Sequence, residues 1–334
     1  MKNIWKKMSR KTFGVWFDFK IQPDNEWIIL FERLIKAGIK ECFVNANVEQ
    51  LEYLISFTKN YDLNIHGWVW TLNRPYDKTA IKNLNWYSIN RNGQNCYESR
   101  PYVDYYQWLS PFSEGARDYI KNNILEIAKI EGIASVHLDY VRFCDVYLPE
   151  NLQKYYKINQ THEFPEFDFG YHPNARKAFK KKFGVDPLNI KDDLLAKKWK
   201  QFRCDAVTSL VSESKLIAKN NNTQISAAVF PYPEMSKEMV LQDWSTWELD
   251  IICPMNYHHF YNGDIDWIAD SVNKGVEYKD LNGKYLSGLF LGALTPSELK
   301  EAVNKSLERG ADGVSLFSYD QLTEEHIKVL KLFY

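Results

Sequence analysis

The chain has 334 residues with a formal net charge of -1, and 45% of the residues are hydrophobic. These values are typical of a globular protein and give no reason to expect a nucleic acid or an acidic membrane surface as partner. No apolar run is long enough to cross a membrane, and residues 1–12, which we expect to form a flexible tail, lack the apolar core of a signal peptide. We therefore expect a cytoplasmic protein, or an exported one whose signal was removed. The sequence makes no prediction of oligomeric state.

Aromatic residues make up 15% of the chain, including 11 Trp and 21 Tyr. Such a content is typical of a large core, or of a groove in which flat rings pack against the C–H faces of sugars. The five Cys are scattered, and no spacing resembles a zinc site or a disulfide framework, so we expect reduced thiols. No metal site and no cofactor are predicted.

In the amino-terminal part of the chain, short apolar runs alternate with helical periods. The predicted strands and helices cover, in turn, 13–19, 25–37, 39–46, 49–60 and 64–70. Short strands that alternate with helices indicate parallel βα units. A long aromatic stretch without regular period follows at 73–111, and a helix is predicted at 113–130 with Ser113 as its N-cap.

The run from Gly132 to Phe143 organises the chain. It starts apolar and ends on charge, which fits a buried parallel strand that emerges into a polar region. Asp139 then stands at the carboxyl end of this strand, and Arg142 follows in the loop. Because a buried carboxylate must be paired or used, a structural Asp139–Arg142 ion pair and a functional Asp139 are both open at this point.

The second half continues the alternation. After another irregular aromatic stretch, helices are predicted at 174–183, 199–219, 295–309 and 324–332. Strands are predicted at 225–230, 249–256, 285–291 and 313–319. Together these elements predict a single domain over 1–334 with the (β/α)₈ TIM-barrel fold, an α/β architecture, and long insertions at 73–111 and 144–173, after the third and fourth strands. A dinucleotide-binding sheet is the weaker alternative, because no glycine-rich phosphate motif follows the first strand.

Several segments resemble the glycosyl-hydrolase-like family ten of bacteria, whose members are barrel proteins. The segments are Phe13-Gly14-Val15-Trp16, His66-Gly67-Trp68, Trp108-Leu109-Ser110-Pro111, Ala116-Arg117-Asp118-Tyr119, His137 to Phe143, Gln242-Asp243-Trp244 and Asp250 to Tyr257. They occur in the family's order. Cys144 stands where the family has proline, and the fifth strand ends in Phe230-Pro231-Tyr232 instead of a Pro-Phe-Gly type. The resemblance implies a glycoside hydrolase that acts on a polysaccharide or glycan strand.

Glycosidases normally use two carboxyl groups, one as acid and one as base or nucleophile. Asp139 is the first of these by position and by resemblance. Its partner stays open, because Asp18, Glu234 and Asp320 each follow a predicted strand end. We name Glu234 and Asp320 as the catalytic candidates beside Asp139. Asp243 matches a family position, but it is as readily a helix cap.

Candidate substrate-binding residues lie at the same strand ends, because the carboxyl ends of barrel strands carry the sites of this fold. They offer charge, flat rings or hydrogen-bonding groups that suit a sugar: Asp18, Trp70, Tyr140, Arg142, Tyr232, Asn256, Tyr257 and Tyr319. His66 and His137 lie in mid-strand, and we expect them to be hydrogen-bonded core residues. His258 and His259 have no neighbouring ligand at metal-binding spacing.

Two functions from different classes follow from these residues. The first is hydrolysis of O-glycosidic bonds by carboxylate acid/base chemistry. The second is a non-catalytic carbohydrate-binding barrel, because the second carboxylate is not evident. In either case we expect the two long insertions to pack against each other and to form one wall of a carbohydrate-binding groove, since they leave adjacent strands from the same end.

Overall fold

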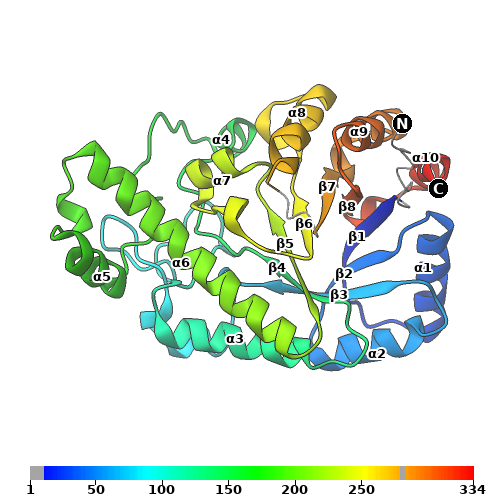
Figure 1. Cartoon of the computed structure of the whole chain (residues 1–334), viewed down its shortest axis with the longest axis horizontal. Coiled ribbons are helices and arrows are strands. Elements are labelled where there is room, and N and C mark those ends of the chain that lie inside the picture. The colour runs from blue at the N-terminus through cyan, green and yellow to red at the C-terminus, as the bar shows by residue number, and fades with distance from the viewer. Residues whose placement is uncertain (1–10, 279–282) are drawn as a thin grey trace, which may run out of the picture.

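The computed structural model, which describes residues 11–278 and 283–334, is a closed barrel of parallel strands surrounded by helices (Figure 1). The strands are β1 (Thr12–Asp18), β2 (Glu41–Asn45), β3 (Asn64–Trp70), β4 (Ser135–Asp139), β5 (Gln224–Val229), β6 (Ile251–Pro254), β7 (Lys284–Phe290) and β8 (Gly313–Phe317). They pair in sequence order, and β8 closes onto β1. The TIM-barrel prediction is therefore confirmed. Thr12 already belongs to β1, and the rest of the predicted tail, apart from Lys11, lies outside the described residues.

The helices cover the outside of the barrel. They are α1 (Asp24–Lys36), α2 (Val48–Thr58), α3 (Glu114–Ala128), α4 (Glu150–Tyr156), α5 (Pro173–Phe183), α6 (Asp193–Asn220), α7 (Pro233–Val240), α8 (Ile265–Val276), α9 (Pro296–Glu308) and α10 (Glu324–Leu330). Ser113 caps α3 as predicted. Helix α6 begins earlier than predicted because Asp192 caps a first turn that contributes no buried side chain, and the buried stripe begins only at Trp199. None of the helices in the described ranges is long and apolar enough to cross a membrane.

The strands alternate between two cores. Trp16 belongs to the small core inside the barrel, together with Phe43 and Trp68, whereas Phe17 packs in the larger core between strands and helices. Because side chains alternate along a strand, the residues two positions beyond these inward rings also face the inside, at the carboxyl end of the barrel. Asp18, Asn45 and Trp70 hold such positions.

A chain of hydrogen bonds crosses the barrel interior beneath these positions. Its links are Trp16 Nε1 to His137 Nε2 (3.3 Å), His137 Nδ1 to Ser226 (2.8 Å), Ser226 to Ser135 (2.8 Å), Ser135 to His66 Nδ1 (2.7 Å) and His66 Nε2 to Glu41 (2.9 Å). An indole can only donate, so His137 accepts at Nε2 from Trp16, and burial lowers the pKa of His137 well below its ordinary value. A carboxylate can only accept, so His66 donates from Nε2 to Glu41. The prediction that both histidines are hydrogen-bonded core residues is confirmed.

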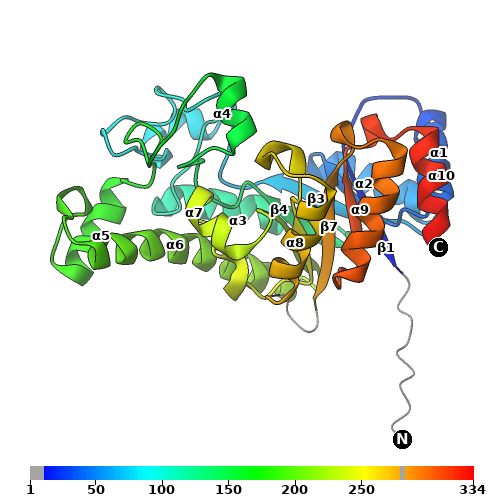
Figure 2. The same cartoon turned by 90° about the horizontal axis from the view of Figure 1, so that it is seen from above.

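The two insertions pack against each other, as predicted. Tyr102 of the first insertion stacks on Phe167 of the second, with ring centroids 4.3 Å apart, and its hydroxyl donates to the Asp145 carbonyl (2.9 Å). Asn90 also forms an isolated β-bridge with Phe169. In Figure 2 these insertions and α4 stand as one lobe on one side of the barrel. Whether this lobe is the wall of a groove stays a prediction.

Candidate active site

Asp139 ends β4 with its carboxylate held by two N–H groups. Trp68 Nε1 donates to Oδ2 (3.0 Å), and the backbone N–H of Tyr140 donates to Oδ1 (2.6 Å). Burial raises the pKa of Asp139, while these two hydrogen bonds and the charge of Arg142 oppose the rise. A carboxyl group whose pKa is raised keeps its proton closer to neutral pH, which is the property of a general acid.

Aromatic side chains lie beside this carboxyl group. The Tyr140 ring lies 4.7 Å from the ring of Trp70 and 5.6 Å from that of Trp108, measured between centroids. Tyr105 from the first insertion extends this group, with its ring 6.3 Å from Trp70 and 39% of its surface exposed. The structure therefore brings Asp139, Trp70 and Tyr140 together, and adds an exposed ring that could pack against a sugar.

Tyr257 follows β6, which lies two strands along the barrel from β4 and Asp139. Its ring packs near Phe290 (5.8 Å) and Phe317 (5.9 Å). Burial raises the pKa of Tyr257 well above its ordinary value, and the negative charge of Asp139 adds to this rise. The phenol is therefore neutral and can donate a hydrogen bond to a ligand or to the Asp139 carboxylate.

Arg142 is not paired with Asp139. Its guanidinium donates to Asp145 (3.1 Å) and lies over the rings of Trp108 (4.8 Å), Phe230 (5.0 Å) and Tyr140 (5.5 Å). Only 6% of its surface is exposed. The structural Asp139–Arg142 ion pair does not form, and the enclosed guanidinium supports a structural role for Arg142 instead of contact with substrate.

The prediction of Glu234 as a catalytic carboxylate is wrong. It lies on α7 and accepts a hydrogen bond from Tyr278 (2.8 Å), while the ammonium of Lys274 lies 4.5 Å from the centre of the Tyr232 ring. Lys274 lies in the last turn of α8 and Tyr278 follows this helix, so Glu234 faces the end of α8 on the outside of the barrel. Tyr232 is placed away from the site for the same reason, because the chain turns outward after β5.

Asn256 and Tyr319 also turn away from the barrel interior. Asn256 is fully buried and donates to Ser287 (3.0 Å), whose hydroxyl bonds Ser306 of α9 (3.1 Å). Tyr319 lies in a short 3-10 helix after β8, near Phe17 and beneath the guanidinium of Arg33 on α1. Both side chains therefore occupy the layer between strands and helices, which corrects their prediction as substrate ligands.

Asp18 and Asp320 lie at the rim, at the ends of β1 and β8. Asn45 donates to Asp18 Oδ1 (2.8 Å), and Lys20 forms an exposed ion pair with Asp320 (2.8 Å). Sequence reasoning missed the contribution of Trp68 and Asn45. The signal was available in the two-residue alternation, because Trp68 and Trp70 must face the same side of β3.

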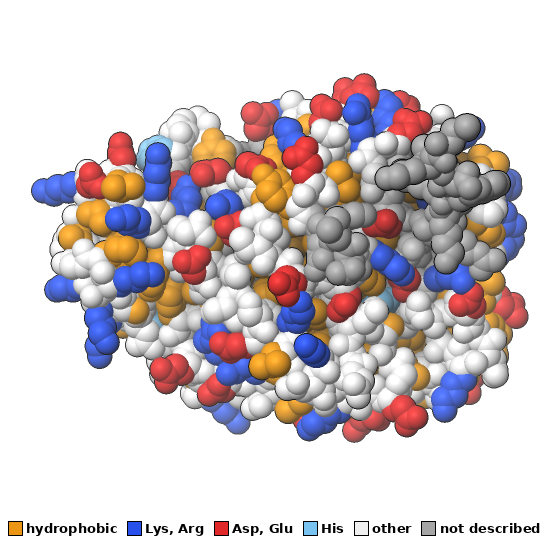
Figure 3. All heavy atoms as spheres, viewed as in Figure 1, with side chains coloured by type: hydrophobic (Ala, Val, Ile, Leu, Met, Phe, Trp, Pro, Cys, Tyr) orange, Lys and Arg blue, Asp and Glu red, His pale blue; other side chains and the backbone are white. Residues whose placement is uncertain are grey.

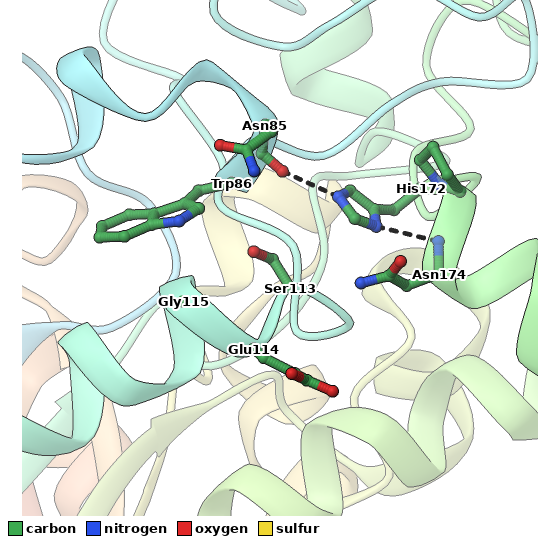
Figure 4. A pocket seen from close by; sticks show the side chains of 8 residues that line it. Asn85, Trp86, Ser113, Glu114, Gly115, His172 and Asn174 are labelled. Atoms are coloured by element: carbon green, nitrogen blue, oxygen red, sulfur yellow. Dashed lines mark hydrogen bonds between the residues drawn. The ribbon is translucent and has the colours of Figure 1, made fainter.

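A separate pocket of about 350 Å³ lies where α3 and α5 begin (Figure 4). His172 donates from Nε2 to the Asn85 carbonyl (2.8 Å) and accepts at Nδ1 from the Asn174 N–H (3.2 Å). Burial lowers the pKa of His172. Trp86 packs on Tyr119, with centroids 5.6 Å apart. Because both nitrogens of this neutral histidine are engaged in the fold, the pocket offers no free acid or base from it.

The fold is similar to solved glycoside hydrolases. It matches the PgaB (BpsB) glycoside hydrolase domain from Bordetella bronchiseptica with a TM-score of 0.70 and 12% identity, over 97% of this chain and 98% of that chain. It matches a beta-galactosidase from Bacillus circulans sp. alkalophilus with a TM-score of 0.66 and 13% identity, over 98% of this chain and 56% of that chain. The catalytic domain of a beta-amylase from Paenibacillus polymyxa matches with a TM-score of 0.60 and 12% identity, over 97% and 98%.

At these identities the structural matches show a shared fold. No protein of curated function matches this chain in sequence. Residues 18–279 match the family model described as "Putative glycosyl hydrolase domain". This match covers more than half of the chain, including β2 to β6 and Asp139, and the chain therefore belongs to this glycosyl hydrolase family.

Proposed function

We propose that this protein hydrolyses O-glycosidic bonds in a polysaccharide or glycan strand, with Asp139 as the general acid. The observation that carries the proposal is the position of Asp139 at the carboxyl end of β4, with a raised pKa and with aromatic side chains beside it. Family membership supports the reaction class.

In this mechanism the protonated Asp139 gives its proton to the leaving glycosidic oxygen as the C–O bond breaks. The carboxylate that forms is held by the N–H groups of Trp68 and Tyr140, which are already in place. Such preorganised donors stabilise charge as it develops. Trp70 and Tyr105 offer ring faces for a sugar, and Tyr257 offers a neutral phenol as hydrogen-bond donor.

A non-catalytic carbohydrate-binding barrel is the second candidate. It is favoured by one observation: among the described residues, no second carboxyl group forms a hydrogen bond or ion pair with a group that holds Asp139. A binding protein needs the aromatic surface but no acid and base.

The test is a screen with 4-nitrophenyl glycosides of galactose, fucose and N-acetylglucosamine, with starch and with a panel of bacterial and plant glycans. We expect turnover of at least one substrate, and a loss of about 10²- to 10⁴-fold in kcat for Asp139→Asn. Glu234→Gln is the matched control and keeps its rate. Turnover that survives Asp139→Asn within about tenfold contradicts the acid assignment. Binding without turnover, measured by calorimetry, supports the second candidate.

A further inference from the structure

The first observation concerns where Asp18 points. Trp16 lies in the core inside the barrel, and Asp18 follows two residues later on β1, so its side chain is on the same inward face. Unlike Trp16 it is exposed, since it stands at the open carboxyl end. β1 and β4 are separated by two strands on one side and by four on the other, so Asp18 and Asp139 lie on nearly opposite walls.

The second observation is that Asp18 is fixed but not neutralised. Asn45 is its partner across the β1–β2 pair, and its amide donates to Oδ1. Within the described residues Oδ2 accepts no hydrogen bond, and no ion pair is formed with Asp18. Lys20 lies nearby, but its ammonium bonds Asp320, which is the first cause of the raised pKa of Lys20. Asp18 therefore presents an oriented carboxylate with one free oxygen.

The other carboxyl groups considered are engaged elsewhere. Glu234 lies on α7 outside the barrel and accepts a hydrogen bond from Tyr278, and Asp320 is paired with Lys20. Asp145 is buried in its ion pair with Arg142. Asp18 is the remaining carboxylate of this set that combines an inward direction, exposure and an oxygen without a partner.

We propose that Asp18 is the second carboxyl group of the site and acts as the general base across the barrel from Asp139. This inference rests on the proposed function. Asp139 gives its proton to the glycosidic oxygen, the bond from that oxygen to the anomeric carbon breaks, and the water oxygen forms a bond to that carbon. Asp18 takes one proton of this water. One water is consumed, and the proton returns from Asp18 to Asp139 through solvent.

The placement on nearly opposite walls leaves room for a water as well as a sugar. Inverting glycosidases separate their carboxyl groups by about 6.5–9.5 Å for this reason, and retaining ones by about 5–5.5 Å. The first hydrolysis product should therefore have the inverted anomeric configuration.

The kinetic test uses a 2,4-dinitrophenyl glycoside of the sugar that the wild type cleaves. Its leaving group needs no proton, so Asp139→Asn should lose less than about tenfold on it, whereas Asp18→Asn should lose about 10²-fold or more. Azide needs no base, so added azide should restore turnover in Asp18→Asn and give a glycosyl azide. Asp320→Asn is the matched control, since it removes an exposed rim carboxylate, and it should stay within twofold of the wild type.

The outcomes separate the two claims. If the wild type cleaves no glycoside, the proposed function fails. If the wild type is active and Asp18→Asn keeps its rate, only the present inference is overturned. Retention of configuration, followed by nuclear magnetic resonance of the first product, also overturns the assignment of Asp18 as base.

A second measurement needs no substrate. The carbon resonance of the Asp139 carboxyl group can be titrated in the wild type, in Asp18→Asn and in Asp320→Asn. A neighbouring negative charge raises the pKa of a carboxyl group, so Asp18→Asn should lower the pKa of Asp139 by about half a unit. Asp320→Asn should leave it unchanged, because Lys20 already compensates that charge. If the pKa of Asp139 is the same in Asp18→Asn as in the wild type, the assignment of Asp18 as the second carboxyl group of the site is overturned.

Discussion

Two polar regions share the inside of this barrel, and they lie on the same strands. On β4, His137 belongs to the hydrogen-bonded chain, and Asp139 lies two residues further on in the candidate site. In this chain of hydrogen bonds, every side chain from Trp16 to Glu41 is bonded to the next one. At the site, a carboxyl group with a raised pKa stands beside exposed rings. The comparison teaches that satisfaction of hydrogen bonds, more than residue type, separates a structural polar group from a functional one.

Figure 3 shows that the outer face seen in Figure 1 is covered by both signs of charge in a mixed pattern. This agrees with the near-zero net charge. The contrast that matters for function is therefore inside the barrel, along the strands, and not between charged faces of the surface.

The largest expected effect is on the structural region. His66→Leu removes the ring nitrogens that hydrogen-bond Ser135 and Glu41, which leaves buried groups without these partners. We expect a loss of about 3–5 kcal/mol in the free energy of unfolding, measured with urea. The kcat of the folded fraction should change less than twofold. Asn64→Ala is the control, because Asn64 is exposed and also donates to Glu41 (2.9 Å), and it should cost much less.

The second prediction concerns acid. Although burial raises the pKa of Glu41, the hydrogen bond and the charge of His66, a hydrogen bond from Asn64 and the charge of Lys284 hold it at about 2. A carboxyl group with a depressed pKa stabilises the fold above its unfolded pKa, and this contribution is lost as the pH falls from about 4.5 to about 2. The loss should approach about 3 kcal/mol. The free energy of unfolding, measured over this pH range, should show the loss in the wild type. If Glu41→Gln shows the same pH dependence, Glu41 is not the cause of the loss.

The smallest effect sharpens the functional side of the comparison. Trp68→Phe removes the indole N–H that stabilises the charged form of Asp139, so the pKa of Asp139 should rise by about half a unit. The pH above which kcat/KM declines should rise together with the pKa of Asp139, and kcat should fall about tenfold. Trp70→Phe is the control, because the buried Trp70 Nε1 has no hydrogen-bond partner. In Trp70→Phe the pH dependence of kcat/KM should stay as in the wild type. An equal shift in Trp68→Phe and Trp70→Phe would refute the role of the hydrogen bond from Trp68 to Asp139.

Most of the fold could be predicted because hydrophobic periodicity and the residues that cap helices or form turns are local features of the sequence. β3 was predicted with its observed bounds, and the other strands within a few residues. Helices α4, α7 and α8 were missed. The first two are short and lie between prolines and aromatic turns, so their sequence carries less than two full turns of apolar period.

The site was only partly predictable. Asp139 was found because an apolar run ends on a carboxylate. Glu234 and Tyr232 were wrong because the direction of the chain after β5 is set by tertiary bonds, such as that from the Phe230 N–H to Gln242 (2.9 Å). Asn256 could have been excluded as a substrate ligand from the sequence alone. Side chains alternate along a strand, and Asn256 stands an odd number of positions after the inward Cys253 of β6. The partner of Asp139 could not be found, because strand order around the barrel decides which strand ends face each other.

The joint between the two insertions has a consequence for how such a protein can change. Asp168 of the second insertion is fully buried and accepts hydrogen bonds from Arg91 of the first insertion and from Arg203 of α6. Exchange of the second insertion would remove Asp168 and leave the buried Arg203 of α6 without its counter-charge, at a cost of several kcal/mol. A chimaera intended to alter specificity should therefore carry both insertions and keep a carboxylate opposite Arg203.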